Sequence, residues 1–136
     1  MTYQHVRADR HRPIEFVSSA LLSFPVACFT LTVLTDIAYW QTLNLLWLHF
    51  SEWLLFAGLV FGALALVALA IEFAVRRVRP VWSAALAGIV VLLLATLNSF
   101  VHTADGWTAV MPYGLTLSVL TVVAMIATAW LGARHD

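Results

Sequence analysis

The sequence predicts an all-α integral membrane protein, an antiparallel bundle of four transmembrane helices with both termini in the cytoplasm. Of its 136 residues 62% are hydrophobic and 10% are charged, too apolar a composition for a soluble domain to shield from water. The chain holds four apolar runs, each long enough to cross a hydrocarbon core, which takes roughly 20 helical residues. Its arginines lie outside these runs, and their placement predicts the orientation.

The first two spans are expected at residues 16–39 and 50–75, after a polar cytoplasmic arm at 1–13. Pro13 suits the first turn of a helix, and Pro25 inside the first span removes a backbone donor and predicts a kink. Asn44 is a candidate cap for the second helix. This helix begins near Trp47 at the membrane interface and crosses the bilayer from residue 50 onward.

The third and fourth spans are expected at residues 81–102 and 113–132. Pro80 opens the third helix directly after a very short link, so the second and third helices must be antiparallel neighbours. Asp105-Gly106 marks the turn that leads toward the fourth helix. All four spans belong to one domain, residues 1–136.

The positive charges support an even number of spans. They lie before the first span, in the middle link and after the fourth span, namely Arg7, Arg10, Arg12, Arg76, Arg77, Arg79 and Arg134. Under the positive-inside rule these regions face the cytoplasm, which predicts a multi-pass membrane protein with an even number of spans. The net charge is zero and there is no lysine, which argues against nucleic acid as a partner.

Small and polar residues at helical spacing mark the faces that pack together in lipid. The third span has such a stripe at Ala84, Gly88, Val91, Ala95, Asn98 and His102. On the first span the corresponding face ends with Asp36. Asp36, Asn98 and His102 are therefore expected to lie close together near the periplasmic surface.

This polar cluster has two interpretations. In the first, Asp36 and His102 form a hydrogen bond or ion pair, completed by Asn98, that holds the first helix against the third. In the second, His102 is an axial ligand of a b-type haem, because imidazole is the usual haem ligand. His49 would be the second ligand, although it lies about half a turn from the Gly58 and Gly62 face of its helix at ~100° per residue.

The remaining polar residues have more limited roles. Glu52, Asp105 and Trp107 are expected at the periplasmic surface, where the two acids and the histidines have no recognised metal-ligand spacing. Glu72 and Arg76 are four residues apart and predict a cytoplasmic ion pair. The sequence has no nucleophile beside a base and no paired catalytic carboxylates, so an independent enzyme is not expected.

Several stretches resemble a bacterial membrane-protein family catalogued as domain of unknown function 2231. They are Phe24-Pro25, Asp36-Ile-Ala-Tyr39-Trp40, Phe50-Ser-Glu-Trp-Leu-Leu-Phe-Ala-Gly58-Leu-Val-Phe-Gly62, Asn98-Ser-Phe-Val-His102-Thr-Ala-Asp105-Gly-Trp107-Thr and Trp130-Leu-Gly132. The resemblance implies a four-helix inner-membrane protein. It also implies an association with quinoprotein sugar dehydrogenases, beside or fused to which similar domains occur.

These observations together predict a small accessory subunit of a membrane assembly. The subunit would anchor a periplasm-facing redox partner or relay electrons for it, with the lipid bilayer and a protein partner or a second copy as its contacts. The alternative is a structural or assembly subunit without a cofactor. A small transporter or channel is the third reading, and the cytoplasmic half supplies few polar residues for such a path.

Overall fold

The computed structural model describes residues 12–76, 81–103 and 110–134, and in the first range the side chains of residues 20–75. The described residues form four helices and no strand: α2 (Arg12–Thr42), α3 (Leu45–Arg76), α4 (Trp82–Thr103) and α5 (Tyr113–Ala133). Each helix contains a stretch that is long and apolar enough to cross a membrane. The predicted fold class of four transmembrane helices is therefore confirmed, whereas the orientation of the termini stays a prediction.

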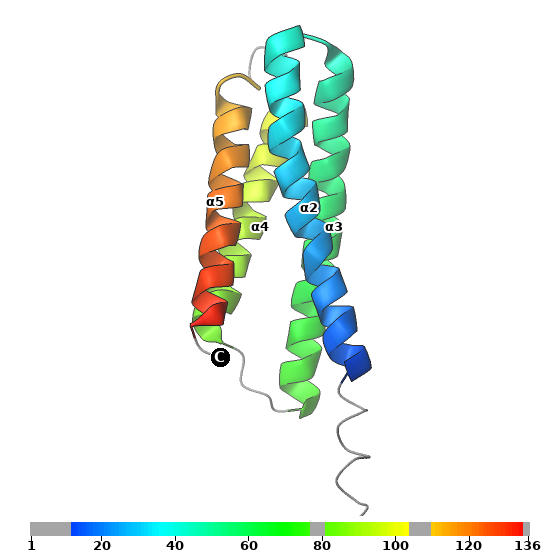
Figure 1. Cartoon of the computed structure of the whole chain (residues 1–136), viewed down its shortest axis with the longest axis vertical. Coiled ribbons are helices and arrows are strands. Elements are labelled where there is room, and N and C mark those ends of the chain that lie inside the picture. Colours follow the sequence, from blue (N-terminus) through cyan, green and yellow to red (C-terminus); the bar gives the residue numbers. More distant parts are fainter. Residues whose placement is uncertain (1–11, 77–80, 104–109, 135–136) are drawn as a thin grey trace, which may run out of the picture.

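The helices run alternately up and down as two hairpins, α2 with α3 and α4 with α5 (Figure 1). Each hairpin is tightly packed, and fewer contacts join the hairpins to each other through α3 with α4 and α2 with α5. We call the end where α2 meets α3 the hairpin end. The opposite end, where α2 begins and α5 ends, is the terminal end.

The α2–α3 connection explains why α3 starts at Leu45, earlier than the sequence predicted. The side-chain oxygen of Asn44 accepts a hydrogen bond from the backbone N–H of Leu46 at 3.0 Å, which is the interaction of a helix N-cap. Leu43 has φ of 53°, the left-handed conformation that commonly ends a helix. The chain thus reverses within two residues after Thr42, so α2 and α3 pack closely from the hairpin end onward.

Two apolar clusters form the core at different depths. One lies near the hairpin end and contains Tyr39, Leu48 and Val110. The other lies nearer the middle and contains Phe29, Leu55, Val91 and Ala95.

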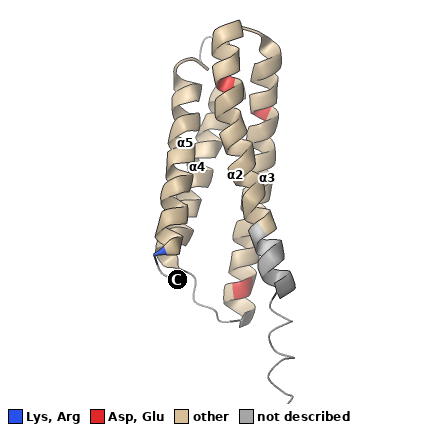
Figure 2. Cartoon of the chain, viewed as in Figure 1, with Lys and Arg blue, Asp and Glu red and all other residues tan. Residues whose placement is uncertain are grey.

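The outer surface carries exposed large apolar side chains along every helix, among them leucine and valine. Figure 2 shows how few charged residues the helices carry. Among the described side chains the acidic and basic residues are Asp36, Glu52, Glu72 and Arg134. Such a surface is suited to contact with lipid tails.

Candidate functional site: a buried carboxylate that joins four helices

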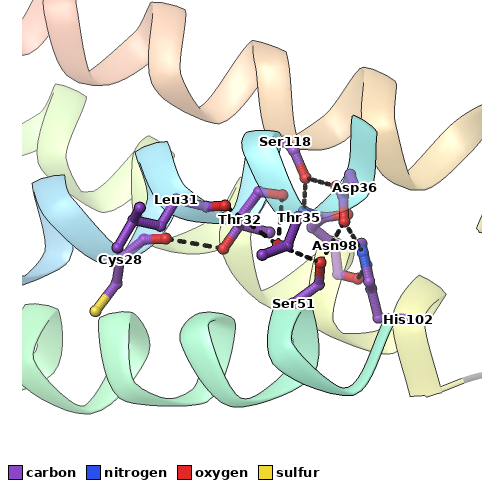
Figure 3. A network of polar contacts seen from close by, with 9 residues as sticks. All are labelled: Cys28, Leu31, Thr32, Thr35, Asp36, Ser51, Asn98, His102 and Ser118. Carbon is purple, nitrogen blue, oxygen red and sulfur yellow. Dashed lines mark hydrogen bonds and ion pairs between the residues drawn. The ribbon is translucent and has the colours of Figure 1, made fainter. Parts of the chain in front are cut away.

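Asp36 of α2 is the centre of a buried polar network at the level between the two apolar clusters (Figure 3). Its Oδ1 accepts hydrogen bonds from Ser51 Oγ of α3 at 2.6 Å and from His102 Nε2 of α4 at 2.8 Å. Its Oδ2 accepts one from Ser118 Oγ of α5 at 2.5 Å. One carboxyl group, itself 0% exposed, thus contacts a side chain from each of the other three helices.

Both ring nitrogens of His102 are engaged. Nδ1 lies 2.9 Å from the backbone oxygen of Asn98, and because a carbonyl oxygen only accepts, Nδ1 carries a proton and donates it. The contact between Nε2 and Asp36 Oδ1 holds one further proton. We place this proton on Nε2, which donates it to the Asp36 carboxylate, so neither ring nitrogen has a free lone pair.

Asn98 extends the network along α4. Its Nδ2 donates to Ser118 Oγ at 2.7 Å, so the Ser118 hydroxyl accepts from Asn98 and donates its single proton to Asp36. The Asn98 side chain is 0% exposed. Its Oδ1 has no hydrogen-bond partner among the described residues, so this amide is only half satisfied.

Ser51 connects the carboxyl group to hydroxyls on α2. Its oxygen lies 2.7 Å from Thr35 Oγ1, and since Ser51 donates to Asp36, it accepts from Thr35. Thr32, one turn earlier on α2, donates to the backbone oxygen of Cys28 at 2.9 Å. The polar contacts drawn in Figure 3 therefore follow α2 for about two turns and then end at a backbone carbonyl.

Close packing fixes the histidine ring in place. Gly114 of α5 lies so near it that a Cβ added there would be 3.0 Å from His102 Cε1 and 3.1 Å from Val110 Cγ1. Val110 belongs to the apolar cluster on the hairpin side, and Ala95, one turn below Asn98, belongs to the cluster on the other side. The two clusters shield the network from water, which strengthens its electrostatic interactions.

The structure thus brings together Asp36, Asn98 and His102, the three residues that the sequence placed in one polar cluster. Neither Ser51 nor Ser118 was among the residues that the sequence predicted for this cluster. Ser51 lies seven residues before Gly58, on the same face of α3. That spacing, on a helix whose small residues face inward, was the available signal.

The structure places His49 apart from this network. Its side chain is 64% exposed, and its Nδ1 lies 3.3 Å from Glu52 Oε2, whose side chain is 30% exposed. This pair sits on the outer surface of the first turns of α3. His49 and His102 therefore do not face a common site in this arrangement.

Other candidate residues fall partly or wholly outside the described part of the chain. Asp105 and Trp107 lie outside it, and the side chain of Arg76 does too, so the Glu72–Arg76 ion pair stays a prediction. Glu72 is half-buried near the terminal end of α3. Among the described residues no group of three or more histidine, cysteine or acidic side chains is arranged to hold a metal ion.

The residues do not fit a haem in this conformation. Axial ligation needs an imidazole nitrogen with a free lone pair directed at an open space. His102 is 2% exposed, and both of its nitrogens contact protein oxygens. Haem binding by His102 and His49 stays a prediction that would require this network to open.

Comparison with known proteins identifies the family. Among curated proteins, and among solved structures, none matches this chain. A family model matches residues 19–136, which include nearly all of α2 and the whole of α3, α4 and α5. The matched region therefore contains the complete Asp36 network. The chain belongs to the family described as predicted membrane protein, domain of unknown function 2231.

Proposed function

We propose that this protein is a structural accessory subunit of a bacterial inner-membrane assembly, and that it works without a cofactor. The observation that carries the proposal is the Asp36 carboxyl group, which accepts a hydrogen bond from each of the other three helices. The geometry suits a group that joins helices more than one that binds a substrate.

The physical reason lies in the membrane environment. Lipid tails are as apolar as leucine, so helices in a bilayer gain little from apolar contact and associate through close packing and polar pairs. Here a single polar network connects the two hairpins, which otherwise share few contacts. The network therefore supports a role in holding the bundle in one shape. A subunit that presents a fixed surface to a partner needs such a shape.

The partner is the part of the proposal that rests on family resemblance. Anchoring a periplasm-facing redox protein agrees with the association of similar domains with sugar dehydrogenases. Between 17% and 28% of each span is buried within the bundle. Much of the helical surface is thus free for lipid, for a partner or for a second copy.

An electron-relay function would need a bound redox group, and a transporter would need a polar path. The polar contacts end near Cys28, and the described residues that continue toward the terminal end are almost all apolar. The lack of a polar path among the described residues supports the structural role over a transporter. We likewise propose no independent enzymatic activity.

Two measurements test the proposal. An absorption spectrum of the protein purified from its native membrane, oxidised and reduced, should show no Soret band. A Soret band that disappears in His102→Ala would overturn the cofactor-free role. Native electrophoresis of gently solubilised membranes should show the chain in an assembly larger than 15.0 kDa that also contains a second protein. A chain that migrates alone would contradict the subunit role.

A further inference from the structure

The half of the bundle near the terminal end contains a cavity of about 540 Å³ that is lined by all four helices. It begins at the apolar cluster near the middle of the bundle, where Phe29, Val91 and Met125 are among its lining residues. It extends from there to the level of Glu72 and Gly132. Figure 1 shows the two hairpins diverging toward this end. The Asp36 network lies in the other half and shares no residue with the cavity lining.

Two glycines in the lining have no close neighbour among the described residues. A Cβ added at Gly88 or at Gly132 would meet no atom within 4 Å, whereas one added at Gly62 would lie 2.5 Å from Leu92 Cδ2. Glycine inside a helix is less favourable than alanine by roughly 1 kcal/mol. Gly62 is explained by the approach of Leu92, but nothing in the described chain explains Gly88 and Gly132. Their lack of side chains preserves the width of the cavity.

The lining is suited to hydrocarbon and offers little to a polar group. Among the described lining residues the polar side chains are those of Glu72 and Thr128. The Thr128 hydroxyl already donates to the backbone oxygen of Ala124 at 2.8 Å, so it is not free to donate to a quinone carbonyl or a headgroup. Glu72 lies at the outermost level of the cavity, one turn before the end of α3. The interior is therefore an apolar slot.

The dimensions correspond to one lipid chain in one leaflet. Along α3 the lining extends from Gly62 to Glu72, a rise of roughly 15 Å. Half of a bilayer hydrocarbon core is also about 15 Å. The volume would hold roughly 18 groups of the size of a water molecule, which is comparable to the number of carbons in one acyl chain.

The segments outside the described residues at 1–11, 77–80 and 135–136 are not apolar runs. The longest stretch outside the described residues is 1–11, which contains Arg7, Asp9 and Arg10. Residues 77–80 include Arg77 and Arg79, and 135–136 are histidine and aspartate. A bilayer, by contrast, presents hydrocarbon chains to the sides of all four spans.

We propose that this cavity binds one acyl chain of a membrane phospholipid. The acyl chain enters from the leaflet at the terminal end and fills the space between the two hairpins. The acyl chain supplies apolar contacts in the region where the two hairpins do not contact each other. The lipid thereby acts as a non-covalent component of the bundle, in the half that the Asp36 network does not hold together.

Native mass spectrometry can test the proposal on the full-length protein. The protein is reconstituted into vesicles of palmitoyl-oleoyl phosphatidylethanolamine and phosphatidylglycerol, then released in a mild detergent. We expect the wild-type chain to retain one phospholipid. In each of the variants Gly88→Leu and Gly132→Leu the new side chain occupies part of the cavity. The fraction of protein that retains a phospholipid should fall at least fivefold. Ala127→Leu is the matched control, because Ala127 is exposed on α5 and does not line the cavity.

Thermal unfolding of the same proteins gives an independent readout. Adding the phospholipid mixture to delipidated protein should raise the melting temperature of wild type and of Ala127→Leu by several degrees. The two cavity variants should melt at the lipid-bound temperature without added lipid and respond little to it. The proposal is overturned if wild type retains no phospholipid, or if the retained mass is a quinone, a free fatty acid or a second copy of the chain. It is also overturned if the cavity variants retain phospholipid as wild type does.

Discussion

At the scale of single residues, the stability of this protein depends on how the Asp36 carboxyl group is satisfied. An ionisable side chain inside a membrane span is costly unless it is paired. Asp36 is 0% exposed and accepts three side-chain hydrogen bonds, one of them from His102. Removing any partner leaves a buried polar group without that hydrogen bond, which costs about 1–3 kcal/mol.

Replacing Asp36 with asparagine should destabilise the bundle by about 3 kcal/mol, in the range expected when one member of a buried ion pair is removed. The new amide N–H₂ faces donors and cannot accept from them. Denaturation in mixed micelles of dodecyl sulfate and a mild detergent, followed by circular dichroism, measures the change. The control is Glu52→Gln, whose partner His49 is exposed, so the change should stay below about 0.5 kcal/mol. Equal effects of the two substitutions would remove the special role of Asp36.

Two serines make a matched pair for the same measurement. Ser118→Ala should cost about 2 kcal/mol, because it leaves both Asn98 Nδ2 and Asp36 Oδ2 without a partner. Ser83→Ala should change stability by less than about 0.5 kcal/mol or increase it, since Ser83 Oγ is buried with no partner among the described residues. If Ser83→Ala proved the more harmful substitution, the hydrogen-bond assignment at Ser118 would be wrong.

At the scale of the helices, each helix has one stripe, a row of residues that faces the interior of the bundle. The small residues in these stripes do not all have the same packing role. On α3 the stripe includes Leu48, Ser51, Leu55, Gly58 and Gly62, spaced by three or four residues. The glycines on this stripe allow close approach of neighbouring side chains, from Phe29 of α2 at Gly58 and Leu92 of α4 at Gly62. Gly88 on α4 lies at a similar spacing in its own stripe yet faces open space.

This difference predicts opposite outcomes for one substitution at two glycines. Gly58→Ala would place a Cβ against the ring of Phe29, which is 1% exposed and has no room to move. The helices must shift, and we expect a loss of about 1–3 kcal/mol. Gly88→Ala meets no atom, and its better helix propensity should leave stability unchanged or raised by up to about 1 kcal/mol. A destabilised Gly88→Ala in the micelle assay would contradict the open space described at that position.

At the scale of the whole molecule, the bundle has two unlike halves. The half near the hairpin end is held by a buried polar network that connects all four helices. The half near the terminal end contains the apolar cavity and the divergent ends of the hairpins. In the structural subunit that we propose, the polar network would hold one half of the bundle together and a lipid chain would fill the other.

The orientation in the membrane can be measured with reporter fusions. We expect an exported reporter enzyme to be active when fused after Asp105 and inactive when fused after Arg79 or after the C-terminus, because the arginines retain those regions in the cytoplasm. This outcome would place the Asp36 network in the periplasmic half. Activity after Arg79 with none after Asp105 would reverse the topology and contradict a periplasm-facing anchor.

The sequence by itself determined the number of spans, the helical fold and the face of each helix that turns inward. These properties follow from the length of an apolar run and from its period, which are local. Asn98 and His102 could be placed on the inward stripe of α4 in this way, and Asp36 on that of α2. Family membership was also available from the sequence, because the motif residues are contiguous.

Only the tertiary structure decided which side chains meet. Whether Ser51 and Ser118 reach Asp36, whether His102 keeps a free nitrogen and whether Gly88 faces a neighbour all depend on the rotation and separation of the helices. Lipid is as apolar as a neighbouring helix, so hydrophobic periodicity does not fix these quantities in a membrane. They are set by a few polar contacts and close approaches between residues as distant in the chain as Asp36 and Ser118.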